Sequence, residues 1–310
     1  MDSPLLIPQT FVNNTVGALQ IGVLVSYVLF GITTTQAYIY YGRFPEDPIW
    51  IRSMVALVWL LEAAQAALVG YVLYFYTVTD FGDRNHVLQN ALPALMVAFI
   101  LTGAITTLVE LFFTYRINQL SQRLLIPIAL SVLAVVYFMG TLSIAIAGFK
   151  TGTWAGAESQ WGWDILATAI LSVVTDLGIS AVLVFLLFQN RQQGTANTAA
   201  MIDQVIAWTI ETGVVTSLCS VLILIFYEKM TQSFVWLAVL IVKSRLFSNS
   251  LLASLNSRSS LRKMTNVSLP SSAPQFSHSQ AGSRLEDVEM FRVEAKLHRD
   301  NRLGKAEASV

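Results

Sequence analysis

The chain is 310 residues long, carries no net charge and is rich in apolar residues. Apolar residues make up 55% of it, charged residues make up 12%, and the mean hydropathy is +0.60. Soluble domains average about 45–50% apolar and about 25% charged residues. The composition therefore excludes an ordinary soluble domain and predicts an integral membrane protein whose environment is a lipid bilayer. The zero net charge gives no reason to expect a nucleic-acid partner.

Seven stretches are long and apolar enough to cross a bilayer, because a helix needs about 20 residues to span roughly 30 Å of hydrocarbon. Their expected bounds are 16–41, 53–76, 91–115, 124–149, 164–188, 204–227 and 233–253. The short alternating strands of a membrane β-barrel do not occur in the sequence. We therefore predict an all-α bundle of seven transmembrane helices over residues 16–255, preceded by an arm at 1–15.

Lys and Arg residues favour one side of these spans. Only three Lys or Arg residues lie in the N-terminal arm and the second, fourth and sixth loops. The opposite side holds five in its loops, and the tail beyond residue 255 adds more to that side. The first, third and fifth loops hold Arg43, Arg52, Arg116, Arg123 and Arg191. This bias predicts an outside N-terminus and a cytosolic C-terminus in the plasma membrane or an endomembrane. Asn13 then begins a glycosylation sequon on the outer side.

The tail, residues 256–310, differs in composition from the spans. Residues 256–283 are rich in Ser and are typical of a disordered linker. Residues 284–303 are strongly charged and could form a short amphipathic helix that binds a cytosolic partner, or a solvated tail. Ser259 and Ser260 lie among basic residues and are candidate phosphorylation sites, because a phosphate would cancel the attraction to anionic lipid.

Four segments carry a resemblance to a known family. They are "GALQIGVLVSYVLFGITTTQAYIYYGRFPEDP" (17–48), "VTDLGISAVLVFLL" (174–187), "VIAWTIETGVVTSL" (205–218) and "KSRLFSNSLLASLNSR" (243–258). Together they resemble an uncharacterised family of seven-span membrane proteins, typical of mushroom-forming fungi and defined as a domain of unknown function. The last segment is the most specific, with Ser248, Asn249, Ser250, Asn256 and Arg258 as the family pattern has them. The resemblance implies a membrane location and seven helices, and no ligand or activity.

Five polar residues form a candidate intramembrane site: Glu62, Gln65, Asp176, Glu211 and Lys243. Ionisable groups inside a bilayer are costly, so a functional role is their first hypothesis. At 1.5 Å per residue, Glu62, Asp176 and Lys243 lie near the midplane and Glu211 lies closer to the cytosol. We expect Lys243 to pair with Asp176, Glu62 or Glu211 inside the bundle.

Structural alternatives stay open for the same residues. Lys243 could extend to the inner interface with Arg245 beside it. The carboxylates could be neutral, hydrogen-bonded contacts between helices. Glu110 is expected near the inner face of the third span, where packing explains it.

The remaining motifs argue against several classes of protein. No His lies in a span, no Gly-rich phosphate loop opens a helix, and no Ser–His–Asp set can be assembled in the membrane. We therefore expect no metal, no cofactor and no enzymatic activity. Three roles remain: two that would involve a small-molecule ligand, and a structural or lipid-organising role in the membrane. A receptor-like or sensory bundle follows from the seven spans and the Ser-rich tail. A transporter or channel for a small polar solute or cation follows from the midplane carboxylates.

Overall fold

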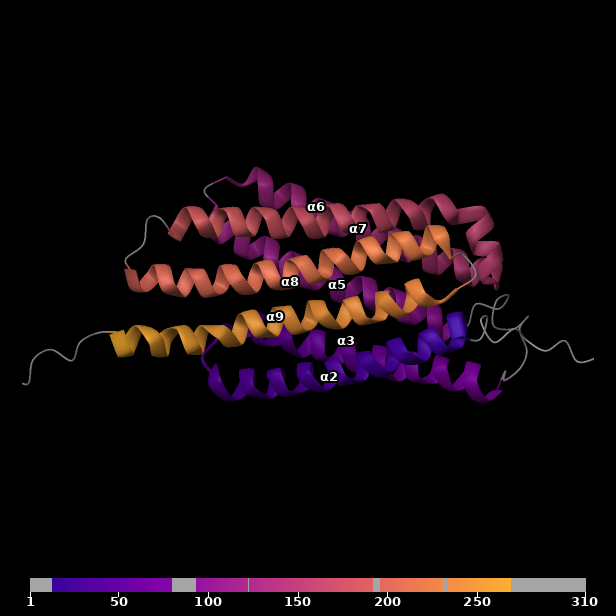
Figure 1. Cartoon of the computed structure of the whole chain (residues 1–310), viewed down its shortest axis with the longest axis horizontal. Coiled ribbons are helices and arrows are strands. Elements are labelled where there is room, and N and C mark those ends of the chain that lie inside the picture. The colour runs from indigo at the N-terminus through magenta and orange to yellow at the C-terminus, as the bar shows by residue number, and fades with distance from the viewer. Residues whose placement is uncertain (1–12, 80–92, 122, 192–195, 231–232, 269–310) are drawn as a thin grey trace, which may run out of the picture. The chain divides into compact units, whose positions relative to one another are not determined.

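The computed structural model describes residues 13–79, 93–121, 123–191, 196–230 and 233–268, and all regular structure in these ranges is helical. Seven long helices run alongside one another (Figure 1). They are α2 (Ala18–Arg43), α3 (Ile49–Tyr74), α5 (Pro93–Leu120), α6 (Leu125–Thr151), α7 (Trp154–Arg191), α8 (Ala196–Lys229) and α9 (Val235–Ser268). Two π-helical turns, η1 (Asn13–Gly17) and η2 (Phe75–Thr79), extend α2 and α3. Each long helix contains a segment apolar enough to cross a membrane, which confirms the predicted all-α, seven-span fold.

The connection between α6 and α7 is much shorter than expected. Gly152 ends α6 in the left-handed conformation, at φ 64°, which glycine adopts without steric cost. Thr153 then accepts a hydrogen bond from the Gly156 N–H at 3.2 Å and caps the next helix. As a result α7 begins at Trp154, ten residues before the predicted span 164–188. Most of the segment left between the predicted spans 124–149 and 164–188 is therefore helical.

Helix α9 also runs further than predicted. The span was expected to end at 253 and a disordered linker to begin at 256, yet the helix continues to Ser268. No Gly or Pro interrupts the sequence before Pro270, so nothing breaks the helix at the membrane exit. Inside α9 the Ser257 hydroxyl donates to the Ser254 carbonyl at 2.9 Å. The predicted helix at 284–303 lies outside the described residues.

Helices α5 and α9 form the interior of the bundle. Of their apolar windows, 67% and 56% are buried, against 22–39% for the other five. Helix α5 packs on α3, α6 and α7, while α8 packs mainly on α7. Large apolar side chains on the outer helices stay exposed, including Ile21 at 66%, Leu60 at 57% and Phe185 at 67%. Such surfaces are stable in hydrocarbon, which is consistent with a multi-pass membrane protein.

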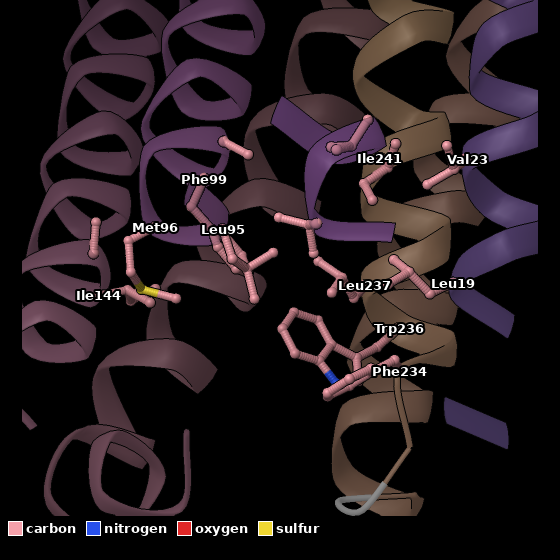
Figure 2. Close-up of a cluster of buried hydrophobic side chains, with 14 of the residues drawn as sticks. Leu19, Val23, Leu95, Met96, Phe99, Ile144, Phe234, Trp236, Leu237 and Ile241 are labelled. Atoms are coloured by element: carbon pink, nitrogen blue, oxygen red, sulfur yellow. The ribbon is translucent and has the colours of Figure 1, made fainter. Parts of the chain in front are cut away.

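An apolar cluster fills one end of the bundle (Figure 2). All seven long helices and η2 contribute side chains to it, with those of α2, α5, α6 and the start of α9 labelled in the figure. Trp236 of α9 stacks on Phe99 of α5 at a ring-centroid distance of 6.0 Å. Beside them lie Leu19 and Leu95, which are 1% and 4% exposed. This end of the bundle contains a close-packed apolar layer.

Helices α2 and α9 approach closely at Gly22 and Ala238. A Cβ placed on Gly22 would lie 2.7 Å from the Ala238 Cβ and 2.8 Å from its Cα. Small residues at a helix crossing let two backbones come together where dispersion and polar contacts replace the hydrophobic effect.

We predict that Gly22→Val forces α2 away from α9 and destabilises the protein by about 1–3 kcal/mol, the usual cost of overpacking. Gly31→Val on the same helix is the matched control, since nothing lies within 4 Å of its added Cβ. Thermal unfolding of the purified protein in detergent measures both. Equal losses for the two variants would contradict the close crossing.

Candidate functional site

Helix α9 carries two buried cations, Lys243 and Arg245, which are 2% and 0% exposed. Two residues apart on a helix, they point about 200° away from each other. Each therefore meets a carboxylate on a different neighbouring helix. The single polar site expected from the sequence is divided into two clusters, defined below as the Lys243 cluster and the Arg245 cluster.

The Lys243 cluster joins α5, α7, α8 and α9. Lys243 Nζ lies 2.8 Å from Asp176 Oδ2 and donates to Ser172 Oγ at 2.5 Å. Ser220 of α8 donates to the same Asp176 oxygen at 2.5 Å. Asp176 is thus the partner of Lys243 among the three carboxylates considered from the sequence. Lys243 does not extend to the interface, because its ammonium is enclosed by the bundle.

Glu110 of α5 completes the Lys243 cluster and corrects an expectation. It was placed near the inner face as a packing residue, but it is fully buried beside Asp176 and Lys243. Helix α5 runs to Leu120, five residues beyond the predicted end of its span, and this moves Glu110 further from the end of the helix. No N–H or hydroxyl group donates to either Glu110 oxygen or to Asp176 Oδ1, and the two carboxyl groups lie close enough to hydrogen-bond to each other through a shared proton.

The formal charges of the Lys243 cluster do not cancel. Glu110 and Asp176 bring two carboxyl groups against the one ammonium of Lys243. An uncompensated charge in a low-dielectric interior is costly until it gains a partner or a proton. One further positive charge, such as a proton shared by the two carboxyl groups, would balance the cluster.

The Arg245 cluster joins α2, α3 and α9. Arg245 forms an ion pair with Glu62 and also donates to the Glu62 carbonyl at 2.8 Å. Its Nε donates to Ser26 Oγ at 3.1 Å, and Ser248 donates to Glu62 Oε1 at 2.6 Å. The guanidinium lies 5.3 Å from the Phe30 ring centroid. The alternative in which Arg245 lies beside Lys243 at the inner interface is therefore wrong, and Glu62 is the partner of Arg245 rather than of Lys243.

Gln65 connects α3 to the two central helices. Its amide nitrogen donates to Thr102 Oγ1 of α5 at 2.5 Å, and Ser244 of α9 donates to its amide oxygen at 3.3 Å. All three side chains are buried. Gln65 therefore holds α3, α5 and α9 together one turn away from Glu62.

Within the segment 243–258, which carries the family resemblance, several side chains contact α2 and the loop that follows it. Asn249 donates to the Leu29 carbonyl at 3.2 Å, and Asn256 donates to the Gln36 carbonyl at 2.9 Å. Ser250 instead donates to the carbonyl of Leu246 in its own helix, at 2.8 Å. The side chains of Asn13, Ser259 and Ser260 lie outside the described residues, so the modification sites stay predictions.

Arg258 fastens the end of α9 to the loop between α2 and α3. Its guanidinium donates to Asp47 Oδ2 at 2.5 Å and lies 4.6 Å from the Phe44 ring centroid. The Tyr40 hydroxyl donates to the same carboxylate at 2.9 Å. Burial by itself would raise the pKa of Asp47, but the hydrogen bonds from Arg258 and Tyr40 and the charge of Arg258 together hold it below the usual value.

Two neighbouring cavities lie between α5, α7, α8 and α9. The inner cavity measures about 30 Å³ and is lined by Glu110 and Asp176. The outer cavity measures about 230 Å³ and is lined by Arg116 and Glu211. Both are lined by Phe113, Thr209, Thr212 and Ser250, and we call the two together the hollow. Glu211 is exposed and lines the outer cavity. It is not the partner of Lys243, although the sequence left that pairing open.

We predict that Arg245→Met destabilises the protein by about 3–5 kcal/mol, because it leaves the buried Glu62 carboxylate unpaired. The double variant Arg245→Met with Glu62→Leu removes both charges and recovers most of this loss. Arg123→Met, on an exposed residue, is the control. Thermal unfolding in detergent reports all three, and a double variant less stable than Arg245→Met would contradict the pairing.

The Asp47 pair predicts an acid-dependent stability. Because folding lowers the pKa of Asp47, the pair stabilises the protein above the ordinary Asp value and this gain disappears as the pH falls through the lowered pKa. Asp47→Asn should cost about 1 kcal/mol at neutral pH, as expected for a partly exposed pair. The difference from wild type should shrink to zero in acid. Glu46→Gln, next to it and exposed, should show no such pH-dependent difference.

Comparison with known proteins gives one match. Residues 172–260 match the family described as "Family of unknown function (DUF6534)". The matched segment contains Asp176, Lys243, Arg245 and Arg258. No curated protein and no solved structure matches the chain. The match lies within α7, α8 and α9, and it confirms the expected resemblance of this part of the chain to an uncharacterised family.

Proposed function

We propose that this membrane protein is a transporter or channel that binds a cation, and a small polar solute with it, in the hollow. The observation that carries the proposal is the Glu110 carboxyl group, fully buried and without an N–H or hydroxyl donor beside the inner cavity. In hydrocarbon such a group is costly unless a proton or another cation reaches it. The proposed site is therefore Glu110 with Asp176, and Lys243 acts as its fixed internal cation.

The hollow supplies a polar route to this site. The outer cavity is bordered by the charged side chains of Arg116 and Glu211, and the walls that it shares with the inner cavity carry three hydroxyl groups. An inner cavity of about 30 Å³ is large enough for one water molecule, which needs roughly 10–15 Å³ of this volume. A water there would connect the two carboxyl groups to the outer cavity.

The far end of the bundle supports a gated route. The apolar cluster around Phe99 and Trp236 lies about 30 Å along α9 from Ser257, which lines the outer cavity. Access from one side with an apolar layer on the other is what one state of an alternating-access transporter requires. By the distribution of Lys and Arg, the outer cavity faces the cytosol.

The receptor-like role expected first from the sequence is the rival proposal. It rests on the order of seven spans, which is an analogy at the level of the fold. Its ligand would have to arrive from outside, whereas the hollow lies toward the proposed cytosolic end. Neither role involves catalysis.

We predict that Glu110→Gln lowers cation flux at least tenfold, because the isosteric amide can no longer bind a cation. The purified chain is reconstituted into proteoliposomes under imposed gradients of H⁺, Na⁺ and K⁺, and internal dyes report each ion. Glu46→Gln, on the exposed loop after α2, should transport like wild type. A folded wild-type chain that carries none of these ions would contradict transport and favour the receptor-like role.

A further inference from the structure

The outer cavity contains two charges of opposite sign that do not pair with each other. Arg116 projects from α5 and Glu211 from α8, and both line the cavity. Within the described part of the chain, Arg116 bonds only the Ser254 hydroxyl, and Glu211 has no hydrogen bond or ion pair. A cavity of about 230 Å³ lies beside two charges that lack counter-charges.

The Arg116 side is suited to an anionic group. Its guanidinium is half-buried, and the charged group that acts on it is a second cation, Arg258, which already binds Asp47. A guanidinium presents a planar fork of donors that matches a carboxylate or a phosphate. Ser254 and Ser257 place two further hydroxyl groups on the same wall.

The Glu211 side is suited to a cationic donor. Its carboxylate accepts hydrogen bonds and would repel a ligand that is only an anion. Thr209 and Thr212 lie on the same helix and line the cavity with it. Phe113 and Ala253 complete the lining with apolar surface. A ligand complementary to this lining carries one negative and one positive group, separated by only a few atoms.

We propose that the outer cavity binds a small zwitterion, such as an amino acid, with its anionic group on Arg116 and its ammonium on Glu211. A volume of about 230 Å³ lies below the usual range of drug-sized pockets. This inference rests on the proposed function in one respect: the zwitterion would be the polar solute that is transported with the cation bound at Glu110. The bound zwitterion and the two side chains together have no net charge, which reduces the cost of moving them into hydrocarbon.

The same pair of groups occurs in two sources. A free amino acid carries a carboxylate and an ammonium, and the headgroup of phosphatidylethanolamine carries a phosphate and an ammonium. Both fit the chemistry of Arg116 and Glu211, and the experiment below has one arm for each.

In the first arm, thermal unfolding of the full chain in detergent is followed with glycine, L-alanine, L-serine and L-threonine. Acetate and methylammonium, at matched ionic strength, test each charge alone. At least one amino acid should raise the unfolding temperature, with an apparent affinity at least tenfold above those of acetate and methylammonium. Arg116→Gln and Glu211→Gln should each abolish this shift, while Arg123→Gln, on an exposed residue at the same end, should keep it.

In the second arm, the chain is placed in nanodiscs of phosphatidylglycerol with or without phosphatidylethanolamine. Stabilisation by phosphatidylethanolamine that both Gln variants lose would support the zwitterion site and assign it to the lipid. Two results would overturn the inference: no shift with any of these probes in either arm, or acetate binding as tightly as the amino acids in wild type. Zwitterion binding by a chain without ion flux would refute transport and leave this site standing.

Discussion

The structure depends on the burial of Lys243 and Arg245 in one helix of a membrane bundle. Neither cation is stable in hydrocarbon alone, so each must lie against a carboxylate. Because they point in different directions around α9, one contacts α7 and the other contacts α3. These two requirements set both the rotation of α9 and its position along the bundle, since a shift of one residue would separate both pairs. The amides of Asn249 and Asn256 and the Arg258–Asp47 pair extend the same alignment to the end of the helix.

The two clusters differ in their balance of formal charge, and this difference separates structure from proposed function. The Arg245 cluster combines an ion pair with hydrogen bonds from Arg245 and Ser248, so its charges are balanced. The Lys243 cluster has an excess carboxyl group, Glu110, and lies beside the hollow. A balanced cluster serves to hold helices together. An unbalanced cluster with access to a polar cavity is suited to bind something that comes and goes.

Much of the fold could be predicted because hydrophobic length is a local property. The apolar residues of each span were enough to locate it. The errors arose at the helix ends, because a capping residue or the absence of Gly and Pro determines where a helix begins or ends. Thr153 and the missing Pro or Gly before Pro270 explain the early start of α7 and the long α9. Lys243 and Asp176 were recognised as costly residues needing partners. Glu110 was misplaced because a depth estimate inherits every error in the predicted end of a span.

The sequence by itself determined that the chain lies in a bilayer, that seven helices cross it, and that some carboxylates and cations must be buried. These conclusions follow from transfer free energies, which belong to residues one at a time. Only the tertiary structure decided which charge meets which, that Glu62 serves Arg245 while Asp176 serves Lys243, and that Glu110 is left over. Such pairings depend on the rotation and spacing of helices far apart in the chain. No local sequence pattern identifies the partner of a buried charge, because several residues of opposite charge could serve as its partner.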